Sequence, residues 1–310
     1  MTIVKGCKVD DSHIVKQDLN PNFERFVARL QRAVQHREVL ESYCKEESAV
    51  TVNTTAKDCL VTVAIKQSTS IPPLASTILS DWLHQIRSAL DGAFYTLAAL
   101  ETNSYPPSQA RTRTFPIRTT RADFDQMLAS DSNPTRGMTK STIESIERSQ
   151  PYHGKYGADG DSLLWIHNMA RIDRHRHSFS LALRVIPNEN NGLDFAARCP
   201  RPVAVTPGPE NTVLKSEEET VFAVIEYDSA ETARHSVSES WISPRFTFGL
   251  EASEWYRDAV ANSLSQNIRN DSLTTRMRFC EWVVSALVKM LSDQISIEQL
   301  HVPDWVNVGN

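Results

Sequence analysis

The chain has 310 residues, of which 40% are hydrophobic and 23% charged, and its formal net charge is −5. This composition is typical of a globular protein, and the acidic balance argues against indiscriminate nucleic-acid binding, which needs a basic field. No apolar run approaches the ~20 residues that span a bilayer, and the N-terminus lacks the apolar stretch of a secretory signal. We therefore expect a cytoplasmic protein without membrane contact.

The first half of the chain alternates between helical and extended patterns. A helix is predicted from the Asn20-Pro21-Asn22 start to about residue 47, followed by a Val- and Thr-rich hairpin over 49–67. After Pro72-Pro73, the most strongly patterned helix covers Asp81–Leu100. Its buried stripe is predicted to comprise Trp82, Ile86, Ala89, Leu90, Ala93, Phe94, Leu97 and Leu100.

The opposite side of the Asp81–Leu100 helix collects its polar residues, including His84, Arg87 and Asp91 at positions i, i+3 and i+7. In one interpretation the arginine binds a phosphate while the histidine or carboxylate moves a proton during phosphodiester cleavage. In the other, this side is a solvated face with an Arg87–Asp91 pair worth a few tenths of a kcal/mol.

An arginine-containing loop follows over 105–121 and either lines an anion groove or lies in solvent. Short helices are then predicted over 123–129 and 139–150, the second capped by Thr139 or Ser141.

A further helix is predicted over Asp161–His177, with Asp173 on the side that faces the core. A buried carboxylate needs a partner, so we expect a polar contact between two helices here, with an arginine as the partner of Asp173. His175 and His177 are two residues apart and point in different directions on a helix, which disfavours a metal site. A general acid or base role for one of these histidines remains the alternative.

The last part of the chain is predicted to contain strands over 179–186, 193–197, 220–227 and 240–248, then helices over 252–262 and 273–291. The fold class is therefore α+β, a helical bundle with an antiparallel β-sheet portion. We expect one domain over 1–310, with a helical core at about 20–47, 71–177 and 252–292 and β portions at about 49–67 and 178–249.

No metal or cofactor is expected. The glycines of the HGKYGADGD stretch match neither a dinucleotide fingerprint nor a phosphate-binding loop. The cysteines form no CxxC pair and predict reduced thiols: Cys7, Cys44, Cys59, Cys199 and Cys280.

Four short segments occur in an order that resembles an uncharacterised bacterial protein family with "LRSALDH", "FPI", "QPY" and "IDKHR" motifs. They are Ile86–Asp91, Phe115–Ile117, Gln150–Tyr152 and Ile172–Arg176. The resemblance covers roughly residues 20–185. The arginine of this family and the histidine five positions later are similar to the R-x4-H pattern of HEPN (higher eukaryotes and prokaryotes nucleotide-binding) domains.

This resemblance implies that Arg87 has the arginine role of a dimeric, metal-independent ribonuclease. The histidine position, however, is Gly92. Either another histidine substitutes (His84, His167 or His175), or the chain is non-catalytic, or the arginine is structural. A glycine in mid-helix costs ~1 kcal/mol against alanine, which suggests close packing of helices at this position.

Two functions follow from these observations. The preferred one is a non-catalytic interaction or structural role, with Arg87, Asp91, Asp173 and Arg176 in a buried ion-pair network. The alternative is a HEPN-like RNA-binding or RNA-cleaving protein, for example in phage defence, with catalytic candidates Arg87, His84, Asp91, Asp173 and His175. Whether the chain is an enzyme stays open, and the partners considered are RNA, another protein and a second copy. A structural Arg87 should be buried against Asp173, whereas a functional one should line a cleft or dimer interface.

Overall fold

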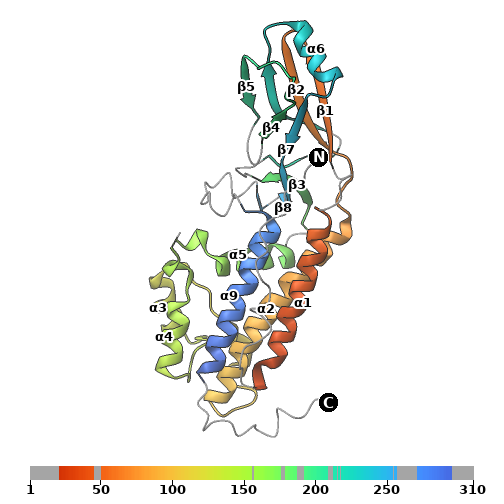
Figure 1. The fold of residues 1–310 in the computed structure, drawn as a ribbon. Helices are drawn as coiled ribbons and strands as arrows, with labels where there is room; N and C mark the ends of the chain where they lie inside the picture. The colour runs from red at the N-terminus through yellow and green to blue at the C-terminus, as the bar shows by residue number, and fades with distance from the viewer. Residues whose placement is uncertain are drawn as a thin grey trace.

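The computed structural model describes residues 21–44, 50–155, 157–175, 179–186, 192–208, 212–214, 216, 218–253, 255–256 and 271–294. Within these ranges, helices and antiparallel strands gather at opposite ends of an elongated molecule (Figure 1). The predicted α+β class is confirmed, whereas the single-domain organisation stays a prediction. No helix in the described ranges combines the length and apolar character needed to cross a membrane.

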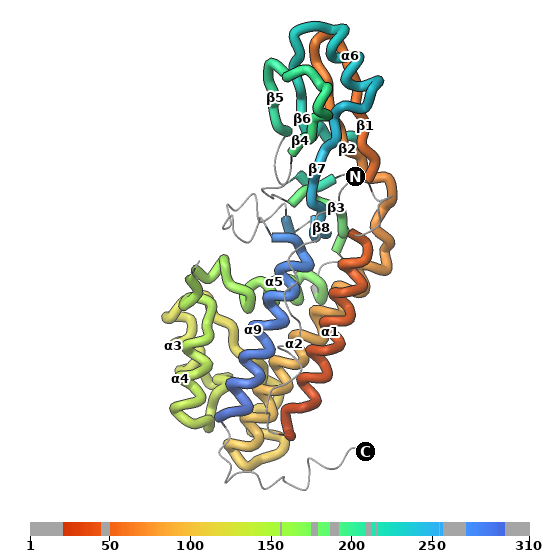
Figure 2. The backbone as a smooth tube through the Cα atoms, in the orientation of Figure 1, coloured from red at the N-terminus to blue at the C-terminus, as the bar shows by residue number. Residues whose placement is uncertain are grey.

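Three long helices lie side by side at the helical end: α1 (Glu24–Ser42), α2 (Pro73–Glu101) and α9 (Leu273–Asp293) (Figures 1 and 2). The predicted apolar stripe of α2 is buried from Trp82 to Leu97, and Leu100 is half-buried. Helix α5 (Ser162–His175) crosses α2 and α9, while α3 (Arg121–Ala129) and α4 (Lys140–Arg148) lie to one side. Thr139 caps α4 as predicted, because its hydroxyl accepts a hydrogen bond from Thr142 N.

The other end holds a four-stranded antiparallel sheet of order β1-β2-β6-β5. Its strands are β1 (Val50–Lys57), β2 (Leu60–Gln67), β5 (Ala204–Pro207) and β6 (Glu219–Glu226). Helix α6 (Ala230–Ser238) packs on β1 and β2, over a small apolar cluster that includes Val61, Val63 and Ile225. Two strand pairs join this sheet to the helices: β3 (Leu181–Ile186) with β8 (Thr247–Ala252), and β4 (Gly192–Phe195) with β7 (Ile242–Arg245).

Several predicted boundaries are wrong. Helix α1 ends at Ser42, not near residue 47, and the single strand expected over 240–248 is divided into β7 and β8, which pair with different partners. The alternating pattern continues through the division, so it gives no sign of the change of partner. Strand β5 and helix α6 were not predicted, and most of the helix expected over 252–262 lies outside the described residues.

A buried ion pair joins helices α1 and α9, at positions other than those predicted. Arg37 Nε of α1 lies 2.9 Å from Glu281 Oε2 of α9, and neither side chain is exposed. Trp82 of α2 donates its indole N–H to the second carboxylate oxygen of Glu281 at 2.8 Å. All three helices therefore meet at one carboxylate.

Gly92 lies where α2 approaches α1, as its mid-helix position suggested. A Cβ atom at this position would lie 2.5 Å from Cε1 of the Phe26 ring, which is buried in α1. The absence of a side chain at Gly92 thus allows the close contact between the two helices.

We expect Gly92→Ala to lower the free energy of unfolding by about 1–2 kcal/mol, because overpacking against Phe26 outweighs the gain in helix propensity. Gly192→Ala is the matched control, since nothing lies within 4 Å of a Cβ there, and it should change stability by less than ~0.5 kcal/mol. Urea denaturation measures both, and a Gly92→Ala protein as stable as wild type would contradict the packing argument.

Candidate functional site

Arg87 and Asp91 form a partly buried pair on α2. Arg87 Nη2 donates to Asp91 Oδ1 at 2.7 Å, and the two side chains are 13% and 27% exposed. The same oxygen accepts a hydrogen bond from the Phe115 backbone N–H at 3.0 Å. Burial raises the pKa of the Asp91 carboxyl, while the charge of Arg87 and the Phe115 N–H oppose that shift. The predicted Arg87–Asp91 pair is therefore present, but it is partly buried and does not lie on a fully solvated face.

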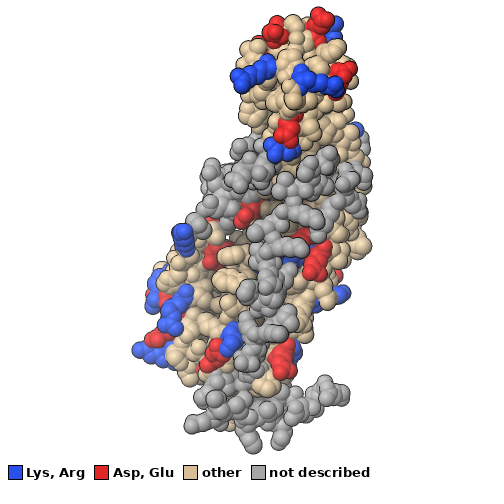
Figure 3. Space-filling view, in the orientation of Figure 1, with Lys and Arg blue, Asp and Glu red and all other residues tan. Residues whose placement is uncertain are grey.

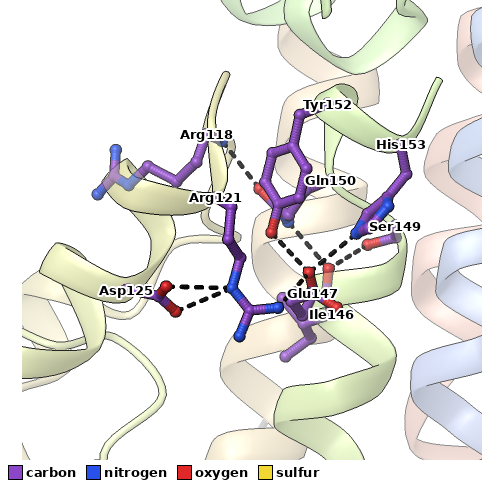
Figure 4. A network of polar contacts seen from close by, with 9 residues as sticks. All are labelled: Arg118, Arg121, Asp125, Ile146, Glu147, Ser149, Gln150, Tyr152 and His153. Atoms are coloured by element: carbon purple, nitrogen blue, oxygen red, sulfur yellow. Dashed lines mark hydrogen bonds and ion pairs between the residues drawn. The ribbon is translucent and has the colours of Figure 1, made fainter. Parts of the chain in front are cut away.

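Gln150 holds the segment that follows Phe115. Its side chain is buried, donates to the Pro116 and Ile146 carbonyls at 3.1 and 3.0 Å, and accepts from the Arg118 backbone N–H at 2.8 Å (Figure 4). Asp91 and Gln150 thus fix 115–118 from two directions. Among the four segments behind the family resemblance, 115–117 is hydrogen-bonded directly to both 86–91 and 150–152.

A cavity of about 270 Å³ lies beside the Arg87–Asp91 pair. Arg87 of α2 and His167 of α5 line it from two helices, and the chain over 112–118 and 132–134 supplies the rest of the wall. Thr114 and Ser132 are exposed, which places the mouth of the cavity at the protein surface. The full lining is Arg87, Thr112, Thr114, Phe115, Pro116, Ile117, Arg118, Ser132, Pro134 and His167.

Three side chains of this lining, Arg87, Arg118 and His167, have nitrogen atoms without a hydrogen-bond acceptor in the described part of the chain. Arg87 Nη1 is a buried nitrogen without a partner, although Nη2 of the same guanidinium is bonded to Asp91. The Arg118 guanidinium extends away from the polar cluster around Glu147 (Figure 4), and the His167 ring completes the set. A buried donor without an acceptor costs about 1–3 kcal/mol, so this cavity offers donors to a ligand that brings acceptors.

The charges of nearby arginines make the electrostatic potential at His167 positive. Burial lowers the pKa of His167 from its ordinary value of 6.5, and the charges of four arginines lower it further. In order of effect these are Arg87, Arg171, Arg174 and Arg118. His167 is therefore neutral at pH 7, and its protonation becomes easier only if an anion offsets these charges.

Asp173 is half-buried and accepts a hydrogen bond from Ser80 Oγ of α2 at 2.5 Å. Helices α2 and α5 thus meet through a polar contact at this carboxylate, and no described arginine is its partner. Arg87 is already paired with Asp91 on its own helix, and a neutral hydroxyl reaches Asp173 instead. The Arg176 member of the predicted network lies outside the described residues.

The remaining histidine candidates do not join the cavity in the described residues. His84 is exposed and lies 3.5 Å from the Ser88 hydroxyl, one turn along α2. Helix α5 ends at His175, whose side chain lies outside the described parts, as does His177. His167 is the imidazole that shares a cavity with Arg87. The sequence alone made it one of three histidines that could substitute for a histidine at position 92.

The arginines of the loop over 105–121 do not line a common anion groove. Arg113 is buried and donates to the Ser108, Pro134 and Arg136 carbonyls, so it stabilises the loop. Arg121 pairs with Asp125 and Glu147, and Arg111 is exposed. Arg118 is the arginine of this loop that lines the cavity.

Glu147 organises a surface cluster next to the cavity wall (Figure 4). It accepts hydrogen bonds from Tyr152 Oη at 2.8 Å, His153 Nε2 at 2.9 Å and Arg121 Nη1 at 2.9 Å. The hydrogen bond from His153 is the largest cause that lowers the pKa of the Glu147 carboxyl. This cluster ties α3 to α4 through Arg121 and Glu147, and no described carboxylate pairs with the Arg118 guanidinium.

The visible surface carries charges of both signs, unlike the cavity, whose charged lining residues are arginines. Figure 3 shows Lys and Arg interspersed with Asp and Glu over the visible face, including the region of α3 and α4. In the part of the chain that the structure describes, no three His, Cys, Asp or Glu side chains gather as a metal site would require. The arrangement is therefore suited to holding an anion through arginine, imidazole and hydroxyl donors.

Comparison of the chain with models of protein families, with curated proteins and with solved structures gives no match.

Proposed function

We propose that the chain is a HEPN-like RNA-binding protein of bacterial type, in which Arg87, Arg118 and His167 hold a phosphate group. The observation that carries this proposal is Arg87 Nη1, a buried guanidinium nitrogen beside a cavity, for which the described residues provide no acceptor. In this proposal α1, α2, α5 and α9 form the helical bundle that fixes the position of Arg87. The order of the four sequence segments supports RNA as the source of the phosphate.

The chemistry of the cavity favours an anion. Its lining contains two arginines, an imidazole and three hydroxyl residues, and no carboxylate stands among its described residues. Asp91, the nearby acid, is occupied by Arg87 and by the Phe115 N–H. Phosphate oxygens accept from guanidinium groups in short, charge-assisted hydrogen bonds, so they satisfy the donors that the protein leaves without acceptors.

The proposed activity is binding without R-x4-H cleavage chemistry. Gly92 faces Phe26 of α1, and a side chain at this position would collide with the Phe26 ring. Arg87 instead contacts Asp91 and the cavity beside 115–118. Position 92, where the R-x4-H pattern has its histidine, thus faces α1 and not the cavity. No residue at this position could act on a phosphate held by Arg87.

A second candidate is the purely structural role of the same polar residues, with a protein partner. The hydrogen bonds from Arg87 and the Phe115 N–H to Asp91 favour it, since they fasten 115–118 to α2. Arg118 separates the two functions. Its backbone N–H bonds to Gln150, whereas its guanidinium holds no described residue in place.

We expect Arg118→Ala to weaken binding of a single-stranded RNA pool by at least about tenfold, the effect of losing one charged hydrogen bond. Arg111→Ala removes the same charge from an exposed position in the same loop and should change the affinity less than about twofold. Fluorescence anisotropy at fixed salt measures both. Absence of RNA binding by wild type, or equal losses in the two variants, would favour the structural role.

A further inference from the structure

We propose that the group entering this cavity is a terminal phosphate, a phosphomonoester at the end of an RNA or on a free nucleotide, instead of a phosphodiester within a strand. This inference rests on the proposed function, because it concerns the same site. It follows from the size of the cavity, from its donors and from its charge.

The cavity is small for a continuous strand. Its volume of about 270 Å³ lies below the roughly 300–1,000 Å³ of typical small-molecule sites. Arg87 of α2, His167 of α5 and the chain over 112–118 and 132–134 surround it. A phosphodiester carries a nucleoside on both sides and must lie along a groove, whereas a terminal phosphate enters from one side.

The hydrogen-bond donors of the cavity match a phosphate with three unesterified oxygens better than one with two. Arg87 Nη1, the Arg118 guanidinium and the His167 ring belong to three different parts of the chain, and all line the same space. The Thr114 hydroxyl lies at the exposed mouth. A phosphomonoester offers three unesterified oxygens to such a set, while a phosphodiester offers two.

The charge of the site also corresponds to a dianion. A phosphomonoester carries about −1.5 to −2 charges at pH 7, and a phosphodiester carries −1. The charge of Arg87 is balanced by Asp91, but Arg118 has no carboxylate partner among the described residues. Arg171 and Arg174 of α5 add to the positive field at His167, which can itself accept a proton. A monoanion would leave part of this positive charge unbalanced.

The test compares one 12-nucleotide RNA in three forms, with a 5′-phosphate, with a 3′-phosphate and with hydroxyls at both ends, by calorimetry at fixed salt. Adenosine monophosphate and adenosine are measured beside them. We expect one phosphorylated form to bind at least about tenfold more tightly than the hydroxyl-ended RNA. This preference should disappear in Arg118→Ala and in His167→Gln and persist in Arg111→Ala.

Each outcome decides between the two proposals. Equal affinity for the three RNAs, lost in Arg118→Ala, would overturn the terminal phosphate and keep the RNA-binding function. Binding of adenosine monophosphate but of no RNA would support the terminal phosphate and overturn the RNA. A preference that survives both cavity variants would place the recognition elsewhere and overturn the inference, and no binding at all would overturn both.

Discussion

Replacement of Arg37 by methionine is expected to lower the free energy of unfolding by about 3–5 kcal/mol, the cost of leaving a buried charge without its partner. Arg37 and Glu281 are both fully buried, 2.9 Å apart, and belong to helices α1 and α9. Without Arg37 the Glu281 carboxylate keeps the indole N–H of Trp82 but has lost its buried counter-charge. Chemical denaturation of the variant and wild type measures the loss.

Two controls separate loss of the pair from loss of volume. The double variant Arg37→Met with Glu281→Gln removes the buried charge and keeps an acceptor for Trp82, so it should recover most of the lost stability. Arg121→Met breaks two surface pairs, with Asp125 and Glu147, whose arginine is 62% exposed, and should cost less than about 1 kcal/mol. A single Arg37→Met variant within 1 kcal/mol of wild type would show that the pair does not stabilise the junction of the three helices.

The second large effect is a dependence of anion affinity on pH. Burial and the charges of Arg87, Arg171, Arg174 and Arg118 lower the pKa of His167 below 6.5 in the free protein. A bound dianion offsets these charges and raises the pKa again, so binding takes up a proton. Sulfate, which stays a dianion over this range, should therefore bind up to about tenfold more tightly per pH unit as the pH falls between the two pKa values.

The same pKa shift fixes the sign of the stability change in the absence of anion. The unfolded chain binds the His167 proton more readily than the folded one, so this contribution is fully present above pH 6.5 and is lost as the pH falls below that value. His167→Gln should abolish the pH dependence of anion affinity and reduce that of stability, to which His36, whose pKa burial also lowers, contributes in the same direction. His84→Gln, which changes an exposed histidine of α2, should abolish neither. Sulfate affinity that does not vary with pH in wild type would contradict the linkage.

The pattern of α2 could be predicted because its periodicity is strong and prolines mark its start. The buried stripe from Trp82 to Leu97 and the polar side with Arg87 and Asp91 follow from spacing alone. The hydrogen bond from Phe115 N–H to Asp91 could not be predicted in this way, since a backbone donor leaves no signal in the sequence. The Gln150 contacts with Pro116 and Arg118 were missed for the same reason.

The buried charged residues could not be predicted from the sequence. Arg37 and Glu281 look like surface residues of amphipathic helices, because charged residues are rarely fully buried. Their pairing joins positions 244 residues apart, which periodicity within one helix cannot reveal. Glu251 of β8, held between Arg184 of β3 and Arg276 of α9, is a second buried group of this kind. An ion-pair network was predicted at Asp173 because this carboxylate continues the apolar stripe of its own helix, which the helical periodicity shows.

The central claim, that the Arg87 cavity binds a phosphate group, is tested most directly by NMR of the His167 imidazole during titration with inorganic phosphate. His167→Gln assigns its resonances, and the other eight of the nine histidines serve as internal references. We predict that the His167 signals shift and saturate and that its pKa rises in the phosphate-bound protein, while exposed His84 stays unchanged. If His167 does not respond, or moves no more than His84, the cavity does not bind phosphate and the claim is wrong.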